Sequence, residues 1–348
     1  MKELALITDP VYTPSASPSR LDLWLEGLCQ DKRDLPFLYL MARITLVLPP
    51  LAVLLYLPFV TGWVWWVVAA AYLYVNNFVF KGPFGLMLHC TSHRILFRKQ
   101  HGWMNRYIPW VLGPFFGQTP ETYLAHHLGM HHPENNLEED ESTTMFYQRD
   151  SLAGYLHYLG DFLALGVMRL VGYFIRKNKP KLMRRTVRGE LFFIVMCIGL
   201  CFVSWQATLV VFLLPMLISR VIMMMGNWAQ HAFIDTKDPG NLYRSSITCI
   251  NTRYNHVCWN DGYHISHHLK PAMHWTEHPV SFRRNVEEYV REDAIVFDGI
   301  HFLHVFFYLM RRRYDLLARH FVNLGGRYGS DEEVMAVLRA RTQRIARG

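Results

Sequence analysis

The sequence is poor in charge, and two long stretches have almost none. Asp, Glu, Lys and Arg make up 18% of its 348 residues, against about 25% in soluble domains. No charged residue and no histidine occurs from Ile44 to Phe80, and only Arg220 interrupts the run from Leu191 to Gly226. A membrane-spanning helix needs about 20 apolar residues, so each run fits two helices, turning near Thr61 and near Trp205. We therefore expect four transmembrane helices in two hairpins.

Several other classes of protein are excluded by what is missing. The six cysteines form no Cys-x-x-Cys pair, which argues against a disulfide framework and indicates reduced thiols. The first twenty residues contain no apolar segment, so we expect no cleaved signal peptide. The net charge is +8 and the pI about 9.2, but no nucleic-acid-binding motif accompanies this charge and no such partner is expected.

Lysine and arginine are unevenly distributed along the chain. The turns inside both hairpins carry none, whereas the segments 81–190 and 231–348 carry most of them. The positive-inside rule then places both termini and all the histidine motifs in the cytoplasm. The predicted fold is an all-α, multi-pass integral membrane protein with a cytosolic helical cap. We divide it into an N-terminal tail with an interfacial helix (1–36), a membrane domain (37–275) and cytosolic C-terminal interfacial helices (276–348).

The segment 152–175 is a special case within the membrane domain. It is mostly apolar but contains Asp161 and Arg169. We expect either a helix lying at the membrane interface or a fifth span.

Histidine is abundant, and it is grouped at helical spacing. Residues three or four apart lie on one face of a helix, so we expect His127 and His131 to point the same way, with His132 beside them. Nine imidazoles and one amide exceed the ligands of one four-coordinate zinc and suit two metals; imidazole binds iron, zinc and copper. The predicted ligands are His89, His93, His127, His131, His132, Asn227, His231, His264, His267 and His268.

The other histidines have weaker patterns. His126 is either a hydrogen-bond partner of a ligand or the true ligand in place of His127. His256 and His274 flank the last motif, and they either orient ligands or are ordinary surface residues. The remaining histidines are interpreted as surface or packed residues: His101, His157, His278, His301, His304 and His320.

The order of these motifs resembles that of the membrane fatty acid desaturase and hydroxylase superfamily. NDGYHISHHLKP (260–271) is similar to the last box of desaturases, N-x-G-Y-H-x-x-H-H-x-x-P. HHLGMHHPENNLEED (126–140) resembles the second box of bacterial alkane hydroxylases, H-x-x-G-H-H followed by acidic residues, although Gly129 lies one place early. NWAQH (227–231) is similar to the Asn-x-x-x-His of stearoyl-type desaturases, in which the Asn acts through water. The resemblance covers residues 40–275.

The resemblance implies a non-haem di-iron centre at the cytosolic membrane surface. With O₂, two irons would oxidise an unactivated C–H bond in a fatty acyl chain, while the protein orients the chain and excludes water. No catalytic residue is expected beyond the metal centre. Desaturation is the first expectation. Oxidative decarboxylation of a free fatty acid to a terminal alkene, and hydroxylation of an alkane or fatty acid, remain alternatives.

Such oxidation needs electrons, and the sequence contains no module to supply them. It has no His-Pro-Gly-Gly haem signature, no nucleotide-binding loop and no Cys-x-x-Cys pair. We therefore expect a separate ferredoxin, rubredoxin or cytochrome as donor. The other expected partners are membrane lipid and a fatty acid or acyl substrate.

Two different functions compete with oxidation. A metal transporter needs ionisable residues inside its spans, and both hairpins are nearly free of them. A membrane haem protein places histidines within the bilayer, whereas here they lie at the ends of the apolar runs.

Overall fold

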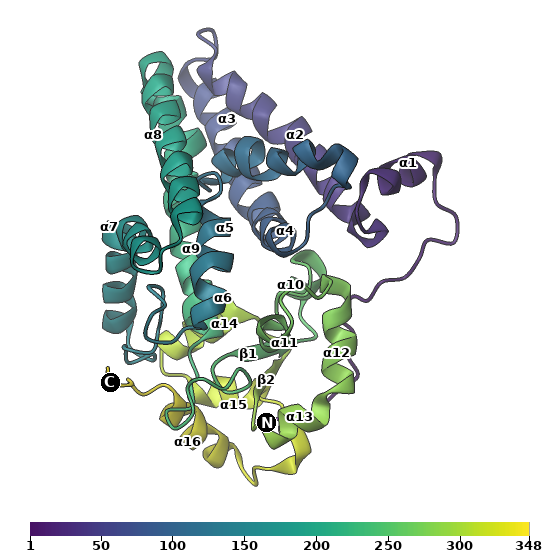
Figure 1. Cartoon of the computed structure of the whole chain (residues 1–348), viewed down its shortest axis with the longest axis vertical. Helices are drawn as coiled ribbons and strands as arrows, with labels where there is room; N and C mark the ends of the chain where they lie inside the picture. The colour runs from purple at the N-terminus through teal and green to yellow at the C-terminus, as the bar shows by residue number, and fades with distance from the viewer. Residues whose placement is uncertain (348) are drawn as a thin grey trace. The chain divides into compact units, whose positions relative to one another are not determined.

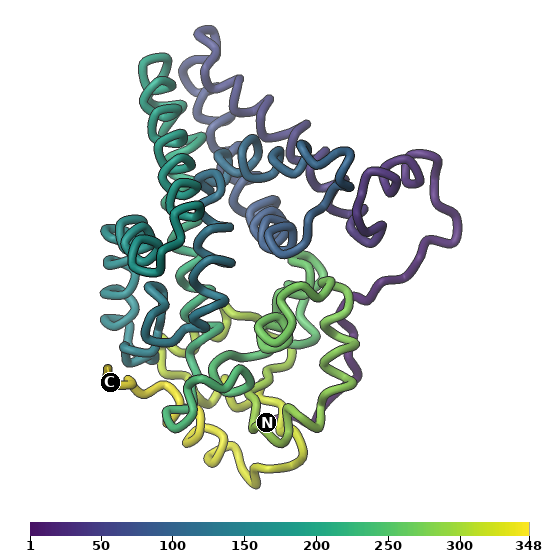
Figure 2. The backbone as a smooth tube through the Cα atoms, in the orientation of Figure 1, coloured from purple at the N-terminus to yellow at the C-terminus, as the bar shows by residue number. Residues whose placement is uncertain are grey.

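The computed structural model describes residues 1–347 and divides them between two compact units. Unit 1 consists of Met1–Tyr12, Gly129–Tyr173 and Val221–Gly348; unit 2 consists of Thr13–Leu128 and Phe174–Arg220. Figure 1 labels the helices and strands, and Figure 2 shows the path of the backbone. Helices dominate both units, which confirms the predicted fold class apart from one small sheet in unit 1.

Unit 2 contains several of the long apolar helices. Helix α2 (Leu35–Tyr56) is followed by α3 (Gly62–Tyr74), and Gly62 has a φ of 57° at the turn between them. A π-helical segment, η2 (Val75–Phe80), joins α3 to α4 (Lys81–His93). Helix α8 (Pro180–Thr208) is broken at Ser204, where φ is −159° and ψ is 105°. Both predicted turning points are thereby confirmed.

Within residues 1–347, four helical segments are long and apolar enough to cross a membrane. They are Lys32–Tyr56, Gly62–His93, Leu152–Arg176 and Pro180–Gln230. The last contains the break at Ser204, so it comprises the two arms of the second predicted hairpin. Helix α7 (Leu152–Arg176) also meets the criterion, which agrees with the fifth span considered from the sequence.

Short helices complete unit 2. Helix α1 begins with a capping box in which Ser19 and Asp22 bond each other's backbone N–H groups. The elements are α1 (Arg20–Leu28), η1 (Lys32–Asp34), η3 (Lys99–Arg106), η4 (Ile108–Leu112), η5 (Gly113–Phe116), α5 (Thr122–His126) and η7 (Leu209–Leu213).

Unit 1 is built around a two-stranded parallel sheet. Strands β1 (Ile247–Ile250) and β2 (Ile295–Asp298) pair from Ile247 with Ile295 to Ile250 with Asp298. Their buried side chains join a core that includes Trp228 of α9 (Leu214–Gln230), a helix that begins in unit 2. Parallel pairing of strands so far apart in sequence is not visible from local patterns.

The segment 300–321 is part of this core. It forms two helices, α14 (Phe302–Met310) and α15 (Tyr314–His320), separated at Arg312, whose φ is 53°. Val305 and Leu317 are fully buried. The other elements of unit 1 are η6 (His127–His131, shared with unit 2), α6 (His132–Glu134), α10 (Arg253–Val257), α11 (His264–Leu269), η8 (Trp275–Glu277), α12 (His278–Arg284), α13 (Val286–Arg291), η9 (Leu324–Gly326) and α16 (Asp331–Arg341).

The first twelve residues pack into unit 1, which the predicted N-terminal tail did not anticipate (Figure 2). Lys2 pairs with Val322 through the backbone, and its Nζ lies 2.6 Å from the Asp298 carboxylate. Asp9 is 4% exposed and accepts hydrogen bonds from the Tyr263 hydroxyl at 2.6 Å and from the backbone N–H of Asn251 at 2.8 Å. A buried carboxylate persists only with such donors.

Candidate metal centre

Four buried histidines in unit 1 bring their ring nitrogens together. His264 and His268 lie four residues apart on α11, and their Nε2 atoms are 3.0 Å apart. His264 Nε2 is also 3.2 Å from Nε2 of His231, which directly follows α9. The His131 ring centroid is 5.3 Å from that of His231 and 5.2 Å from that of His268. One nitrogen from each ring lies within 4.8 Å of the other three.

Burial favours the neutral form of two of these rings. Exclusion of water, with a smaller contribution from His131, lowers the pKa of His231 to about 3. Burial, followed by the neighbouring imidazoles His264 and His231, holds the pKa of His268 well below its usual value. A neutral imidazole has a lone pair available for a metal. Four imidazoles facing one another are poorly served by hydrogen bonds among themselves and fit a metal cation well.

The outward-facing nitrogens of two rings are fixed by hydrogen bonds. His131 Nδ1 lies 2.8 Å from the Asp140 carboxylate, and His231 Nδ1 lies 2.9 Å from the Ser245 carbonyl oxygen. Both partners are acceptors, so each Nδ1 carries the proton and each Nε2 keeps its lone pair. Asp140 also accepts hydrogen bonds from Ser142, at 2.8 Å from its N–H and 2.6 Å from its hydroxyl.

We expect Asp140→Asn to weaken metal binding about 10- to 100-fold, because the hydrogen bond that orients His131 would be altered. The measurement is bound metal per chain during titration with a competing chelator. Asp238→Asn is the matched control, since Asp238 lies in an exposed turn. Equal metal retention by the two variants would contradict the role expected for Asp140.

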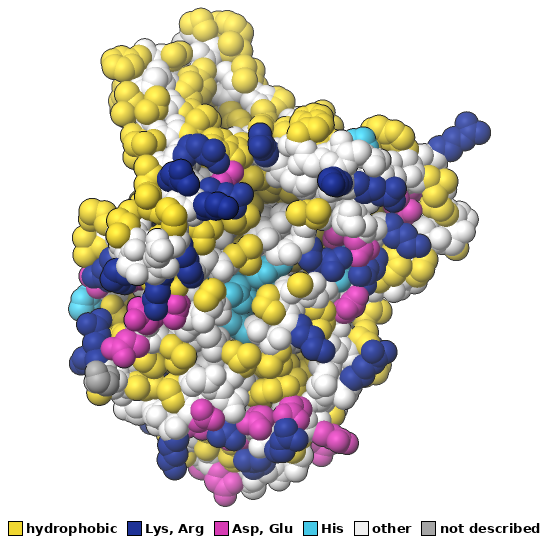
Figure 3. Space-filling view, viewed as in Figure 1, with side chains coloured by type: hydrophobic (Ala, Val, Ile, Leu, Met, Phe, Trp, Pro, Cys, Tyr) yellow, Lys and Arg dark blue, Asp and Glu magenta, His cyan; other side chains and the backbone are white. Residues whose placement is uncertain are grey.

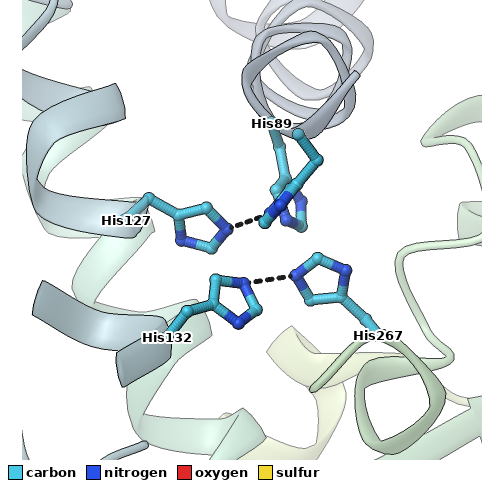
Figure 4. Close-up of side chains that lie close together, drawn as sticks. His89, His127, His132 and His267 are labelled. Carbon is cyan, nitrogen blue, oxygen red and sulfur yellow. Dashed lines mark hydrogen bonds between the residues drawn. The ribbon is translucent and has the colours of Figure 1, made fainter. Parts of the chain in front are cut away.

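A further pair of histidines in unit 1 lies beside this group. His132 and His267 have Nε2 atoms 2.9 Å apart, and Figure 4 draws this contact as a dashed line. The centroid of the His132 ring is 4.8 Å from that of His268. The backbone N–H of His267 donates to the backbone carbonyl of Tyr263. The Tyr263 hydroxyl in turn donates to the Asp9 carboxylate. The N-terminal segment therefore supports the helix that carries the last histidine motif.

Three histidines in unit 2 form a second group. His89 and His93 lie one turn apart on α4, and His127 follows α5. His93 Nε2 is 2.9 Å from His127 Nε2. The His89 and His127 ring centroids are 4.5 Å apart, and Figure 4 labels both residues. One nitrogen from each of the three lies within 4.8 Å of the others. Tyr123, one turn before His127, stacks on its ring with an interplanar angle of 17°.

Helix α8 fixes the position of α5. A Cβ atom on Gly189 would lie 1.7 Å from the Pro120 carbonyl oxygen, so only glycine permits this approach. On either side of Pro120, the Thr119 hydroxyl donates to Glu190 at 2.5 Å, and the Glu121 carboxylate lies 3.1 Å from Arg185. The packing of α8 thus determines where His127 lies.

All nine predicted histidines belong to these sets, but their partition differs from the expectation. The segment His127–His131 is π-helical, so a spacing of four does not keep these two residues on one face. His127 contacts His93, whereas His131 contacts His231 and His268. The expectation that His127 and His131 point the same way is therefore wrong, and the cause is the extra residue in the π turn.

The tenth predicted ligand has a different environment. The Asn227 amide nitrogen donates to the Ser142 carbonyl oxygen at 3.0 Å and to the Tyr158 hydroxyl at 2.7 Å. These contacts place Asn227 next to the turn that contains Asp140 and Ser142. Its predicted role as a ligand remains a prediction.

The histidines left open from the sequence now have locations. His127, rather than His126, faces His93, and His256 is exposed. His274 is buried and bonds Thr276 through Nδ1 at 2.8 Å. Asp140 and Asp9 are the supporting residues that sequence reasoning missed. The acidic run 134–141 was the only available signal for Asp140, and Asp9 had none.

Comparison with known proteins gives one result. A family model described as fatty acid desaturase matches residues 63–299, which include all ten predicted ligands. No curated protein and no solved structure matches the chain significantly.

Proposed function

The chain belongs to the fatty acid desaturase family, and on that premise we propose that it is a non-haem di-iron enzyme that uses O₂ to desaturate a fatty acyl chain. The observation that supports this most strongly is the buried group His131, His231, His264 and His268, four imidazoles whose nitrogens converge. When bound, two irons with O₂ supply the oxidising power that removes hydrogen from an unactivated C–H bond.

We assign the ligands according to these groups. The first iron would be held by the four histidines of unit 1, with Asn227 near them. The second would be held by His89, His93 and His127 of unit 2. His132 and His267 of unit 1 are proposed as further metal ligands. Asp140 and the Ser245 carbonyl would keep the rings of His131 and His231 in place during turnover.

The chain is an integral membrane protein, and we propose that its metal centre and both termini are cytoplasmic. The support is the charge distribution, since neither hairpin turn carries a Lys or Arg while the basic segments flank the spans. Electrons would come from a separate ferredoxin, rubredoxin or cytochrome, because the sequence contains no haem, nucleotide or Cys-x-x-Cys motif to relay them.

Product analysis tests the proposal directly. We expect purified, iron-loaded protein in lipid nanodiscs, with a reduced ferredoxin, O₂ and C12–C18 acyl substrates, to give a chain of unchanged length with one new double bond. Gas chromatography with mass spectrometry distinguishes this product from a shortened terminal alkene or a hydroxylated chain, and either of these would replace desaturation by the corresponding alternative. Omission of the carrier should abolish product. The absence of any oxidised product from free acids, thioesters and lipids would contradict fatty acyl oxidation altogether.

A further inference from the structure

A strongly basic segment leads into the apolar part of α8. Seven of the thirteen residues from 176 to 188 are Lys or Arg, and the first acidic residue after them is Glu190. The apolar run of the second hairpin begins at Leu191. This segment therefore lies where a spanning helix meets the membrane surface, and Figure 3 shows Lys and Arg side chains gathered below the apolar helices.

Two arginines of this segment have different partners. The Arg188 side chain is 60% exposed, and its Nη2 atom lies 3.1 Å from the Glu121 carboxylate. Its guanidinium carbon lies 5.2 Å from the centroid of the Trp110 ring. Arg184 is exposed and donates only to the Pro180 carbonyl of its own helix, at 3.3 Å. Among residues 1–347, it has no carboxylate within ion-pair distance. Three arginines (184, 185 and 188) with one carboxylate among them, that of Glu121, leave a net charge of +2 available to an anion.

The same face of α8 has a groove of about 640 Å³. Its lining repeats at helical spacing along four turns, so it follows the helix axis from the basic segment into the apolar run. The lining residues are Met183, Arg184, Val187, Arg188, Leu191, Phe192, Val195 and Met196. The volume lies within the usual range of ligand sites, about 300–1,000 Å³.

The lining of the groove is almost entirely apolar, and its charged residues lie at one end only, where their aliphatic stems form the wall. Arg184 and Arg188 form the end nearest the start of α8, whereas Leu191 and Val195, further along, are 56% and 65% exposed. These apolar side chains lie in a segment apolar enough to span the bilayer. A ligand that satisfies both ends needs an anionic head and a hydrocarbon tail.

We propose that this groove binds one anionic phospholipid, with its phosphate between Arg184 and Arg188 and an acyl chain along Leu191 and Val195. The charge complementarity is that of juxtamembrane basic clusters with anionic headgroups. An acidic electron carrier is the other candidate for a basic surface, but a folded soluble protein cannot follow the groove past Leu191 into the hydrocarbon layer. The site shares no residue with the histidine groups.

Native mass spectrometry of the purified full chain in detergent tests the proposal. We expect one molecule of dioleoyl phosphatidylglycerol to bind per chain, at least about 10-fold more tightly than dioleoyl phosphatidylcholine. Arg184→Gln breaks no ion pair and should weaken phosphatidylglycerol binding about 5-fold. Val195→Trp should also weaken binding, because it fills the apolar half without changing the charge. Lys237→Gln, which removes an exposed cation elsewhere, should retain the lipid.

Specific results would overturn the inference. Equal binding of the two lipids would show that the arginines do not select the headgroup. If Val195→Trp binds phosphatidylglycerol fully and inorganic phosphate displaces the lipid, the groove does not hold the acyl chain. If an acidic ferredoxin covers Arg184 and the chain does not prefer phosphatidylglycerol to phosphatidylcholine, this surface belongs to the electron carrier. Melting temperatures of the variants in detergent provide a check that each remains folded.

Discussion

We expect His268→Ala to lose one of two bound irons and to reduce product formation more than about 100-fold. The Nε2 atom of His268 lies 3.0 Å from that of His264, and its ring neighbours His131 and His231 at 5.2 Å. Loss of an outer hydrogen-bond partner already costs 10- to 100-fold in metal affinity or activity, so loss of a ligand should cost more. The protein should still insert into the membrane, because His268 lies outside the candidate membrane spans.

The matched control is His256→Ala. His256 lies on α10, close to the last histidine motif in sequence, but it is exposed. We expect it to keep both irons and normal activity. Metal analysis by mass spectrometry and product yield are the measurements. Two irons per chain in His268→Ala would show that the four-histidine group does not hold a metal.

The second large effect concerns Gly189→Ala. The new methyl group would overlap the Pro120 carbonyl oxygen, and neither can rotate away, because the backbone fixes the position of Cβ and the oxygen is itself a backbone atom. Overpacking costs about 1–3 kcal/mol or more, and here the strain would also displace α5, which leads into His127. We therefore expect a lower melting temperature and loss of iron from the group containing His89, His93 and His127.

The same helix offers a control variant that should not lower the stability of the protein. A Cβ atom added at Gly199 of α8 would have no neighbouring atom within 4 Å, so Gly199→Ala creates no overlap. Alanine is favoured over glycine in a helix by up to about 1 kcal/mol, so stability should be unchanged or slightly higher. Thermal unfolding in detergent separates the two variants. A Gly189→Ala protein as stable as Gly199→Ala would contradict the close packing of α5 on α8.

Much of the fold and the site is predictable from the sequence, because the signals are local. Uncharged runs identify the hairpins, since a charge in hydrocarbon is costly. The four-residue spacing of His89 with His93, and of His264 with His268, places each pair on one helical face, and the structure confirms both. These inferences need only the geometry of a regular helix.

The remaining features depend on irregular or distant structure. His131 and His132 are adjacent in sequence, yet His131 lies beside His231 and His132 lies beside His267. The π turn before them changes the register, and no residue pattern marks a π turn reliably. The contact of Asp9 with Tyr263 joins residues 254 positions apart, and a single aspartate near the N-terminus gives no indication of such a contact.

That contact also sets an order of assembly. Unit 1 combines the first twelve residues with segments made much later, and Asp9 cannot meet Tyr263 until about 250 further residues have been synthesised. At ribosomal rates of about 5–20 residues per second, the wait is roughly 10–50 seconds. By then the first hairpin has left the ribosome, whereas the site proposed for the first iron still lacks His264 and His268. If the chain binds iron as proposed, metal loading would be a late event in biogenesis, and cells starved of iron should accumulate inserted, metal-free protein.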